Sequence, residues 1–239
     1  MNRIDNPDRR TPIVRFTPLL PLLILASSLA AAQGPVREPD LDIGEEINEL
    51  CAGCHGEHGE GGKQGVYPRI AGQPYQFLVD QLLMFRLRTR PNLAMIEYMD
   101  ERQMPDSDIQ DVSAYLAAIE LPTRLAPIDE NAPDFDALAR LEEAKKVLQI
   151  PRAEGDVDRG GKLYRRECAS CHGRDGMGER DGNVPMLAGQ YTDYLWRQVE
   201  KYREGLRIHD PDAPEDRLMS EFADDEIRDM FAYLSTLDD

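Results

Sequence analysis

Cys51-Ala52-Gly53-Cys54-His55 is the stretch that decides the fold, and it recurs as Cys168-Ala169-Ser170-Cys171-His172. In both stretches two residues separate the cysteines, and a histidine follows the second cysteine directly. This pattern is the attachment signature of c-type haem. The spacing brings both thiols to one edge of the ring, where they add across its two vinyl groups, and it puts the histidine beneath the iron. The sequence therefore predicts two covalently bound haem c groups. The predicted attachment points are Cys51, Cys54, Cys168 and Cys171, and the predicted proximal iron ligands are His55 and His172.

Three other kinds of site use cysteines in related ways. Four cysteines in an exported protein first suggest two disulfides. A zinc site would need four Cys or His ligands, which the two pairs could supply together. A thioredoxin-like redox pair usually lies between a strand and a helix, without the histidine that follows here. The trailing histidine in both copies, an export signal and an internal repeat all favour haem over these alternatives.

The sequence around the two motifs is an internal repeat, which indicates tandem domains. From Cys51 to Arg90 the second copy follows 117 residues later without a gap. The triplet Ala114-Tyr115-Leu116 returns 118 residues later, so one residue has been gained before the last helix. The recurring positions include Gly56, Gly59, Gly61, Gly65, Pro68, Gln73, Gln81, Arg86 and Arg90 in the first copy, and Gly173, Gly176, Gly178, Gly182, Pro185, Gln190, Gln198, Arg203 and Arg207 in the second.

Each copy predicts a small all-α domain, because apolar residues recur at helical spacing and no segment alternates like a strand. A first helix runs from about Ile43, or Arg159, into the haem motif. A glycine-rich loop follows, which lets the backbone pass close to a flat ligand. A second and a last helix then carry apolar stripes that face the haem. The stripes are Leu78, Leu82 and Phe85 with Leu195, Val199 and Tyr202 for the second helix, and Ile109, Val112, Leu116 and Ile119 with Ile227, Met230, Leu234 and Leu237 for the last.

The N-terminal segment, residues 1–32, predicts a secretory signal peptide. Four arginines precede an apolar run from Phe16 to Ala32, which Pro18 and Pro21 interrupt and which ends in three alanines. A membrane-spanning helix would need an uninterrupted run of roughly 20 apolar residues. We therefore expect cleavage after Ala32 and export to the periplasm.

The rest of the chain divides into two domains and a linker. Residues 33–122 and 153–239 predict one haem domain each, and residues 123–152 predict the linker. Prolines keep the first half of the linker extended, and Asp134 is then expected to cap an amphipathic helix. The apolar stripe of this helix predicts that it packs against one or both domains. The stripe consists of Phe135, Leu138, Leu141 and Leu148.

With both haem motifs, the repeated Ala-Gly-Gln segments and the repeated helices in view, the chain resembles the cytochrome c4 family. Members of that family are periplasmic di-haem proteins built from two class I cytochrome c domains, and the resemblance covers most of both domains. It implies histidine and methionine as iron ligands in each domain, two neighbouring haems and electron delivery toward a terminal oxidase or reductase. It also implies loose, peripheral association with the inner membrane. The long linker, with its own helix, departs from the shorter connection usual in the family.

The distal iron ligand of the first domain is expected in the loop before the last helix, where class I domains place a methionine. This loop holds Met95, Met99 and Met104. Counted from Gln81, Met95 falls at the position of the family's ligand, and Met99 is the runner-up. Met104 falls where the family usually has a core leucine, so we expect it to fill the core.

The second domain departs from the family's pattern at this position. Its matching residues, around Asp212 to Glu215, include no methionine. The candidate distal ligands are Met219 and His209. His209 could instead hydrogen-bond a haem propionate, and an open iron is the remaining alternative. The ligand matters because a thioether raises the reduction potential relative to a second imidazole.

The charge and the remaining residues limit the function. The formal net charge of −17 at pH 7 repels nucleic acid and anionic lipid and suits redox protein partners with basic docking patches, although it would also serve solubility alone. We find no convincing catalytic constellation and therefore expect an electron carrier rather than an enzyme. The alternatives are an electron-transfer subunit of a periplasmic dehydrogenase complex, or a haem enzyme with an open iron in the second domain, for instance a peroxidase or a thiosulfate-oxidising cytochrome.

Overall fold

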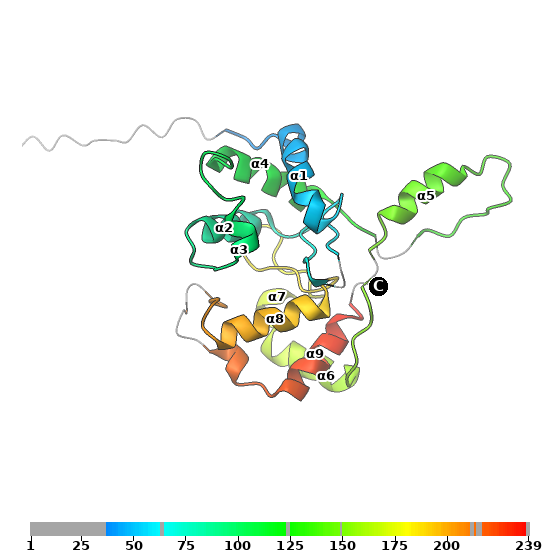
Figure 1. Cartoon of the computed structure of the whole chain (residues 1–239). Coiled ribbons are helices and arrows are strands. Elements are labelled where there is room, and N and C mark those ends of the chain that lie inside the picture. Colours follow the sequence, from blue (N-terminus) through cyan, green and yellow to red (C-terminus); the bar gives the residue numbers. More distant parts are fainter. Residues whose placement is uncertain are drawn as a thin grey trace, which may run out of the picture. The chain divides into compact units, whose positions relative to one another are not determined.

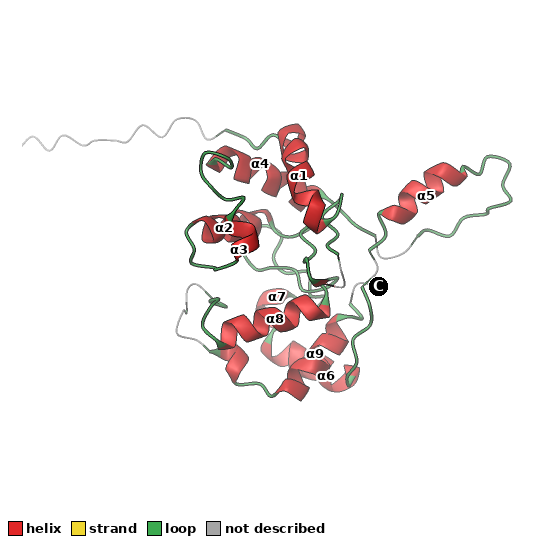
Figure 2. Cartoon of the chain, in the orientation of Figure 1, coloured by secondary structure: helices red, strands yellow, loops and turns green. Residues whose placement is uncertain are grey.

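The structure is a computed structural model that describes residues 37–62, 65–122, 125–148, 150–210, 213 and 217–237. The predicted signal peptide, residues 1–32, lies outside the described residues. Glu38–Asp239 forms one compact unit that holds both copies of the repeat. The regular elements described in it are helices, which confirms the all-α class (Figure 2). None of the described helices is long and apolar enough to cross a membrane.

The first copy of the repeat folds into the helices α1 (Leu41–His55), α2 (Tyr75–Arg86), α3 (Leu93–Ile96) and α4 (Asp106–Ala118) (Figure 1). The carboxylate of Asp40 begins α1, because it accepts hydrogen bonds from the backbone N–H groups of Asp42 and Ile43. Helix α4 packs against both α1 and α2. The core between these helices contains the predicted stripes, among them the buried residues Leu78, Phe85, Ile109, Val112 and Leu116.

The second copy repeats this arrangement with α6 (Val157–Glu167), α7 (Ala169–His172), α8 (Thr192–Arg203), a short 3₁₀ helix η2 (Leu218–Ser220) and α9 (Asp224–Leu234). Helix α6 packs on α9 as α1 packs on α4. The side chain of Asp156 begins α6 by accepting from the backbone N–H of Arg159. The core of this half contains the buried residues Leu163, Tyr164, Leu195, Val199, Ile227, Met230, Phe231 and Leu234.

A glycine and a buried aspartate mark the helix crossing in both halves. A Cβ atom at Gly44 would collide with the backbone of Asp111, and one at Gly160 would collide with the backbone of Asp229. The missing side chains let the helices approach closely. Each aspartate then accepts a hydrogen bond from the backbone that precedes the first helix: Asp111 from Asp40 at 2.8 Å and Asp229 from Asp156 at 2.9 Å.

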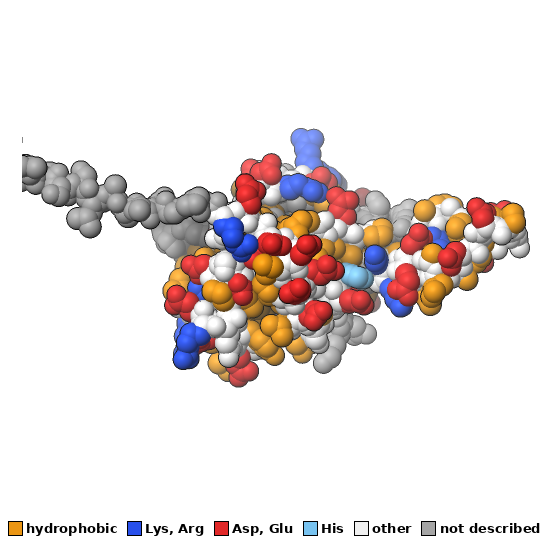
Figure 3. All heavy atoms as spheres, turned by 90° about the horizontal axis from the view of Figure 1, so that it is seen from above, with side chains coloured by type: hydrophobic (Ala, Val, Ile, Leu, Met, Phe, Trp, Pro, Cys, Tyr) orange, Lys and Arg blue, Asp and Glu red, His pale blue; other side chains and the backbone are white. Residues whose placement is uncertain are grey.

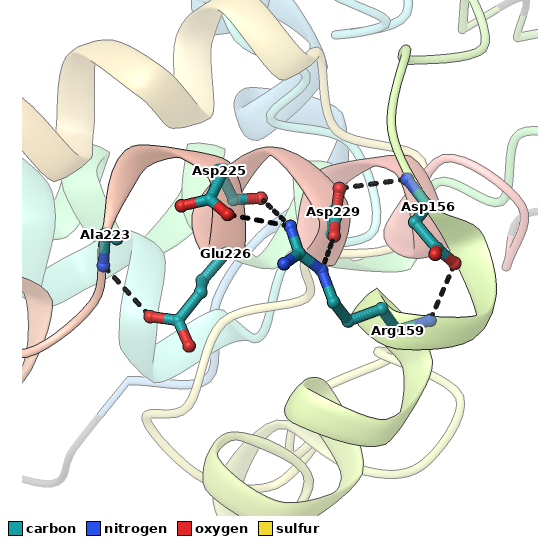
Figure 4. A network of polar contacts seen from close by, with 6 residues as sticks. All are labelled: Asp156, Arg159, Ala223, Asp225, Glu226 and Asp229. Carbon is teal, nitrogen blue, oxygen red and sulfur yellow. Dashed lines mark hydrogen bonds and ion pairs between the residues drawn. The ribbon is translucent and has the colours of Figure 1, made fainter.

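In the second half this crossing is tied down by a larger polar network (Figure 4). The Nε atom of Arg159 donates to the Asp229 carboxylate, and its Nη2 atom donates to the Asp225 carboxylate at 3.0 Å. At the start of α9, the Glu226 side chain accepts a hydrogen bond from the backbone N–H of Ala223 at 3.0 Å. The network therefore joins the start of α6 to the first turns of α9.

The two halves differ where the first helix meets the haem motif. Helix α1 is continuous through His55, whereas α6 ends at Glu167 and the motif continues in α7. Cys168 lies one residue further from Gly160 than Cys51 lies from Gly44. A continuous helix cannot absorb an extra residue while its two ends keep their packing, because each added residue turns the helix by about 100°. The helix accordingly breaks at Cys168.

The linker contains a helix, but its start differs from the sequence prediction. Helix α5 (Ala137–Lys145) begins at Asp136 rather than Asp134. The Asp136 carboxylate accepts hydrogen bonds from the backbone N–H groups of Leu138 at 2.9 Å and Ala139 at 3.0 Å. Aspartates at neighbouring positions are equally good caps by type, and the helix starts at the one whose side chain reaches these N–H groups.

The prediction that the linker helix packs against the domains is wrong. Leu138 is 68% exposed and Leu141 is 54% exposed, and Figure 1 shows α5 apart from the other helices. Leu148, which lies beyond the end of α5, does pack, against Ala71 and Leu121. The spacing of apolar residues predicted the helix but carried no information about what would cover its apolar face.

Candidate functional site

The two haem motifs place their cysteines on one side of a helical turn, since residues three apart in a helix are neighbours. The structure pairs none of the four cysteines in a disulfide, so all four remain available to attach haem. Cys51 and Cys168 are half-buried, and their partners Cys54 and Cys171 are exposed. Burial raises the pKa of the Cys51 and Cys168 thiols to about 11. Before haem is attached, these two thiols are therefore neutral at pH 7.

The motif histidines have the same environment in both halves. His55 and His172 are each 8% exposed. The Nδ1 atom of His55 lies 2.9 Å from the carbonyl oxygen of Pro68, and that of His172 lies 2.9 Å from the carbonyl oxygen of Pro185. A carbonyl oxygen only accepts hydrogen bonds, so Nδ1 carries the proton and Nε2 is the atom left to bind a metal. Burial lowers the pKa of both imidazoles and so favours the neutral form that a metal requires.

A glycine folds the loop after each motif back onto it. The N–H of Gly61 donates to the carbonyl of His55 at 2.7 Å, and the N–H of Gly178 donates to the carbonyl of His172 at 2.9 Å. Gly61 has φ 83° and Gly178 has φ 68°, in the left-handed region. A Cβ atom at either position would meet the backbone next to the proline that holds the histidine. The loop thus fixes the orientation of the imidazole.

In the first half, the methionines of the distal loop share one apolar cluster. Met99 and Met104 are each 4% exposed and lie in this cluster with Val79 and Phe85. Met95, in α3, is partly buried and packs against the same cluster. The structure thus places Met104 in the core, and Met99 is more deeply buried than Met95.

In the second half, the two candidate ligands lie in different surroundings. Met219, in η2, packs against the apolar core cluster of this half, and its backbone carbonyl accepts a hydrogen bond from Arg203 Nε at 2.9 Å. The ring of His209 lies beside the motif histidine, with its centroid 6.2 Å from the centroid of the His172 ring. His209 also meets the Tyr202 ring edge-on, at 5.3 Å between centroids.

A reciprocal pair of glutamines joins the two halves. Gln73 donates to the carbonyl of Met186 and accepts from its N–H, both at 3.0 Å. Gln190 donates to the carbonyl of Arg69 at 2.9 Å and accepts from its N–H at 3.0 Å. Gln73 and Gln190 are equivalent in the repeat, as are Arg69 and Met186. Both glutamines are buried, so these four bonds form a two-fold related contact away from water.

Two buried arginines form a second two-fold related contact. Arg90 donates to Gln81 at 2.7 Å and to Gln198 at 3.2 Å, and Arg207 donates to Gln198 at 2.8 Å and to Gln81 at 3.2 Å. Each guanidinium also lies over an aromatic ring, Arg90 over Phe85 at 4.6 Å and Arg207 over Tyr202 at 4.9 Å. Burial, and then the nearby Arg207 charge, lower the pKa of Arg90. This cluster gives the interface between the halves a buried positive centre.

The donors of each half suit a haem better than they suit zinc. Within the described part of the chain, no group of three or more His, Cys, Asp and Glu side chains is placed to hold one metal ion. The two cysteine pairs therefore do not assemble the shared zinc site considered above. What each half does offer is two thiols on one helical turn and one oriented, neutral imidazole.

The interface residues recur in the sequence, but the sequence alone does not indicate their role. Gln73, Gln81 and Arg90 recur in the second copy, yet they are polar and lie on helices or loops expected at the surface. The buried residues of the two contacts are each 9% exposed or less. This burial arises only when the two halves are in contact. The available signal was that long polar side chains are kept in both copies at constant spacing.

Comparison with known proteins identifies relatives of this architecture. The family model described as "Cytochrome c" matches residues 42–120 and again residues 157–238. The "Thiosulfate dehydrogenase electron acceptor" of Stutzerimonas stutzeri (strain A1501) is 31% identical over 187 residues, covering 78% of this chain and 78% of the relative. "Cytochrome c4" of Thiocapsa roseopersicina is 30% identical over 202 residues, covering 83% of this chain and 93% of the relative.

Solved structures show the same fold. The reduced recombinant cytochrome c4 from Pseudomonas stutzeri matches with a TM-score of 0.61 and 22% identity, over 82% of this chain and 97% of that chain. The thiosulfate dehydrogenase (TsdBA) from Marichromatium purpuratum matches with a TM-score of 0.60 and 29% identity, over 82% of this chain and 40% of that chain.

Proposed function

Because the chain belongs to the cytochrome c family and is a di-haem, electron-transferring cytochrome of the cytochrome c4 type with two covalently bound haem c groups, we propose that it carries electrons in the periplasm between proteins of a respiratory chain. Haem iron supplies one-electron chemistry when bound. The chain's own contribution is to attach, orient and shield the two groups. The observation that carries this proposal is the duplicated motif, whose buried histidines are oriented in the same way in both halves.

The residues proposed to hold the haems follow from the two motifs. Cys51 and Cys54 attach the first haem, and Cys168 and Cys171 attach the second. His55 and His172 present Nε2 to the iron, because Nδ1 is hydrogen-bonded to a proline carbonyl. Met95 is proposed as the distal ligand of the first iron, with Met99 as the runner-up. The proposed haem domains are residues 33–122 and 153–239, and the proposed linker between them is residues 123–152.

The proposed role is that of an electron carrier without catalytic activity of its own. Export through residues 1–32 would bring the chain to the periplasm, with peripheral association at the inner membrane and no role in nucleic-acid binding. The acidic side chains are spread over the face in Figure 3, with hydrophobic side chains reaching the surface between them. A surface of this kind suits a redox partner with a basic docking patch, such as a terminal oxidase or reductase.

A second candidate function is favoured by the relatives. Two of them are named as electron acceptors of thiosulfate dehydrogenase, and they are 31% and 30% identical to this chain. The chain would then accept electrons from a periplasmic dehydrogenase and pass them on. Both functions use the same two haems and differ in the protein that docks first.

Haem attachment is tested by the mass of the protein. Purified from the periplasm and denatured, the chain is expected to have the mass of residues 33–239 plus two haems, because thioether bonds survive denaturation. Replacing both Cys51 and Cys54 by Ser should remove one haem and leave the other. A wild-type mass with a single haem, or with two zinc ions, would contradict the proposal.

The distal ligand of the first haem is tested by removing each methionine in turn. Met95→Ala is expected to abolish the weak near-infrared band of thioether-bound ferric iron and to lower the potential of one haem, since a thioether raises it. Met104→Leu is the matched control, because Met104 lies in the same apolar cluster, and it should leave the band unchanged. If Met99→Ala loses the band while Met95→Ala keeps it, the ligand is Met99.

A further inference from the structure

His209 is the side chain whose surroundings the proposed function does not yet explain. It follows α8 in a loop and is half-buried. Its ring faces that of His172, the motif histidine of the second half, with 6.2 Å between centroids and 55° between planes. Two imidazoles thus lie next to each other in the second half.

The separation of these two rings is that of two imidazoles on one metal ion. A ring nitrogen binds a transition metal at about 2 Å, so two imidazoles on opposite sides of one ion have centroids about 6 Å apart. The Nδ1 atom of His172 is held by the Pro185 carbonyl, which leaves Nε2 for the metal.

The frame around His209 holds the ring in place. Tyr202 meets the His209 ring edge-on, and Arg207 lies over the Tyr202 ring, 4.9 Å from its centroid. Arg207 is in turn hydrogen-bonded to Gln198 at 2.8 Å. The first half has the same frame in Phe85, Arg90 and Gln81, so the position of residue 209 is part of the repeated fold.

The two copies carry different candidate ligands in the loop that follows this frame. The residue of the first copy that corresponds to His209 is Asn92, three residues before Met95. In the second copy a histidine replaces the asparagine, and the positions that correspond to Met95 hold Asp212 or Ala213. The copy that lost the methionine is therefore the one that gained a histidine. Met219 corresponds to Glu101 rather than to Met95, so it does not occupy the position of the first copy's proposed ligand.

We propose that His209 is the distal iron ligand of the second haem, which His172 and His209 then hold between two imidazoles. The proposal rests on the proposed function, since it needs a haem on Cys168 and Cys171. A second imidazole lowers the potential relative to a thioether. The second haem is accordingly the lower-potential one, and electrons at equilibrium reside first on the haem of the first half.

The wild-type protein provides the first test, through electron paramagnetic resonance and near-infrared spectra of the oxidised form. Two low-spin signals are expected, one typical of histidine–methionine iron and one typical of iron with two imidazoles. The thioether band should have the intensity of one haem per chain, and a first-half methionine variant should abolish all of it. A thioether band with the intensity of two haems would overturn the proposal.

Variants supply the second test. His209→Asn introduces the residue that the first copy has at this position. It should weaken one low-spin signal and let that haem bind added cyanide. His209→Met should raise the lower potential and double the thioether band. Met219→Leu, the matched control, should change neither. Loss of a thioether signal or a shifted potential in Met219→Leu, with an unchanged His209→Asn, would assign the ligand to Met219.

The mass of each variant separates this proposal from the one on which it rests. Two haems per chain with the spectra of two thioethers would contradict only the role of His209. A wild-type chain with fewer than two haems would contradict the attachment of haem itself. If His209→Asn does not accumulate, the wild-type spectra still decide between one and two thioether-bound irons.

Discussion

Asp229 is a single buried carboxylate on which the packing of the second half depends. It is 4% exposed, accepts from the backbone N–H of Asp156 at 2.9 Å and pairs with Arg159 (Figure 4). The hydrogen bond from Arg159 is the main reason that the pKa of Asp229 lies below its ordinary value. A depressed pKa means that folding favours the charged form, so the carboxylate stabilises the protein above its ordinary pKa.

Asp229→Asn is therefore expected to lower the free energy of unfolding at pH 7 by about 1.5–3 kcal/mol, the range for hydrogen bonds to a charged group. The deficit should shrink as the pH falls through the folded pKa of Asp229, because the wild-type carboxylate is protonated there. Denaturant unfolding of the holoprotein between pH 7 and pH 3 measures both effects. Asp225→Asn is the control: its side chain is 52% exposed, and its pair with Arg159 is expected to contribute at most about 1 kcal/mol. Equal losses in the two variants would contradict this account.

The role of a single residue can be predicted from sequence when bond chemistry determines it, but not when loop conformation does. The cysteine and histidine spacing is dictated by bonds to one rigid ring, so the sequence alone predicts haem-binding roles for the four cysteines, His55 and His172. The distal position is reached through a loop, and loop conformation is not encoded by spacing. Sequence alone therefore left Met219 and His209 open. The ring contact between His209 and His172 is a tertiary fact.

At the scale of the elements, the crossing of α6 and α9 depends on Gly160. Alanine is preferred over glycine in a helix by about 1 kcal/mol, but a Cβ atom here would collide with the backbone of Asp229. We expect Gly160→Ala to destabilise the protein by about 1–3 kcal/mol, the usual cost of overpacking. Gly53→Ala is the matched control, because the second copy carries a side chain, Ser170, at the equivalent helical position. Thermal unfolding should give opposite signs for the two variants, and a stabilised Gly160→Ala would disprove the close crossing.

Helices were the most predictable elements, since an apolar stripe with helical spacing reports a buried face. The stripes of α2, α4, α8 and α9 are confirmed in this way. The same reasoning failed for α5, whose leucines are exposed, because a stripe does not specify its partner. It also missed the break at Cys168. One extra residue is visible only when the spacing from Gly160 to the motif is compared with that from Gly44.

At the scale of the whole molecule, the negative charge governs how partners approach. With a formal net charge of −17, electron transfer to a partner with a basic patch should slow steeply as salt rises. Steering of this kind changes association rates by about 10 to 10³ fold, over a Debye length of about 8 Å at physiological salt. Stopped-flow rates against ionic strength, with a terminal oxidase and with thiosulfate dehydrogenase, would measure this for both candidate functions. A small uncharged reductant is the control and should give a flat profile. A rate with the protein partners that is flat or rises with salt would exclude attractive steering.

The reciprocal contact of Gln73 and Gln190 also bears on how this chain arose. In this contact, two equivalent glutamines each bind the equivalent backbone groups of the opposite copy. Such an interface is isologous, the kind found between the identical subunits of a symmetric dimer. An ancestral one-haem chain that paired with itself, followed by duplication and fusion of its gene, would leave such a contact. Because both glutamines bind only backbone groups of the other copy, the contact survives side-chain changes on either side. Asp80 and Arg197 are equivalent positions of opposite charge, and they still touch equivalent residues of the other copy, Asn183 and Val66. An interface inherited in this form leaves each copy free to diverge in its chemistry while the pair stays joined.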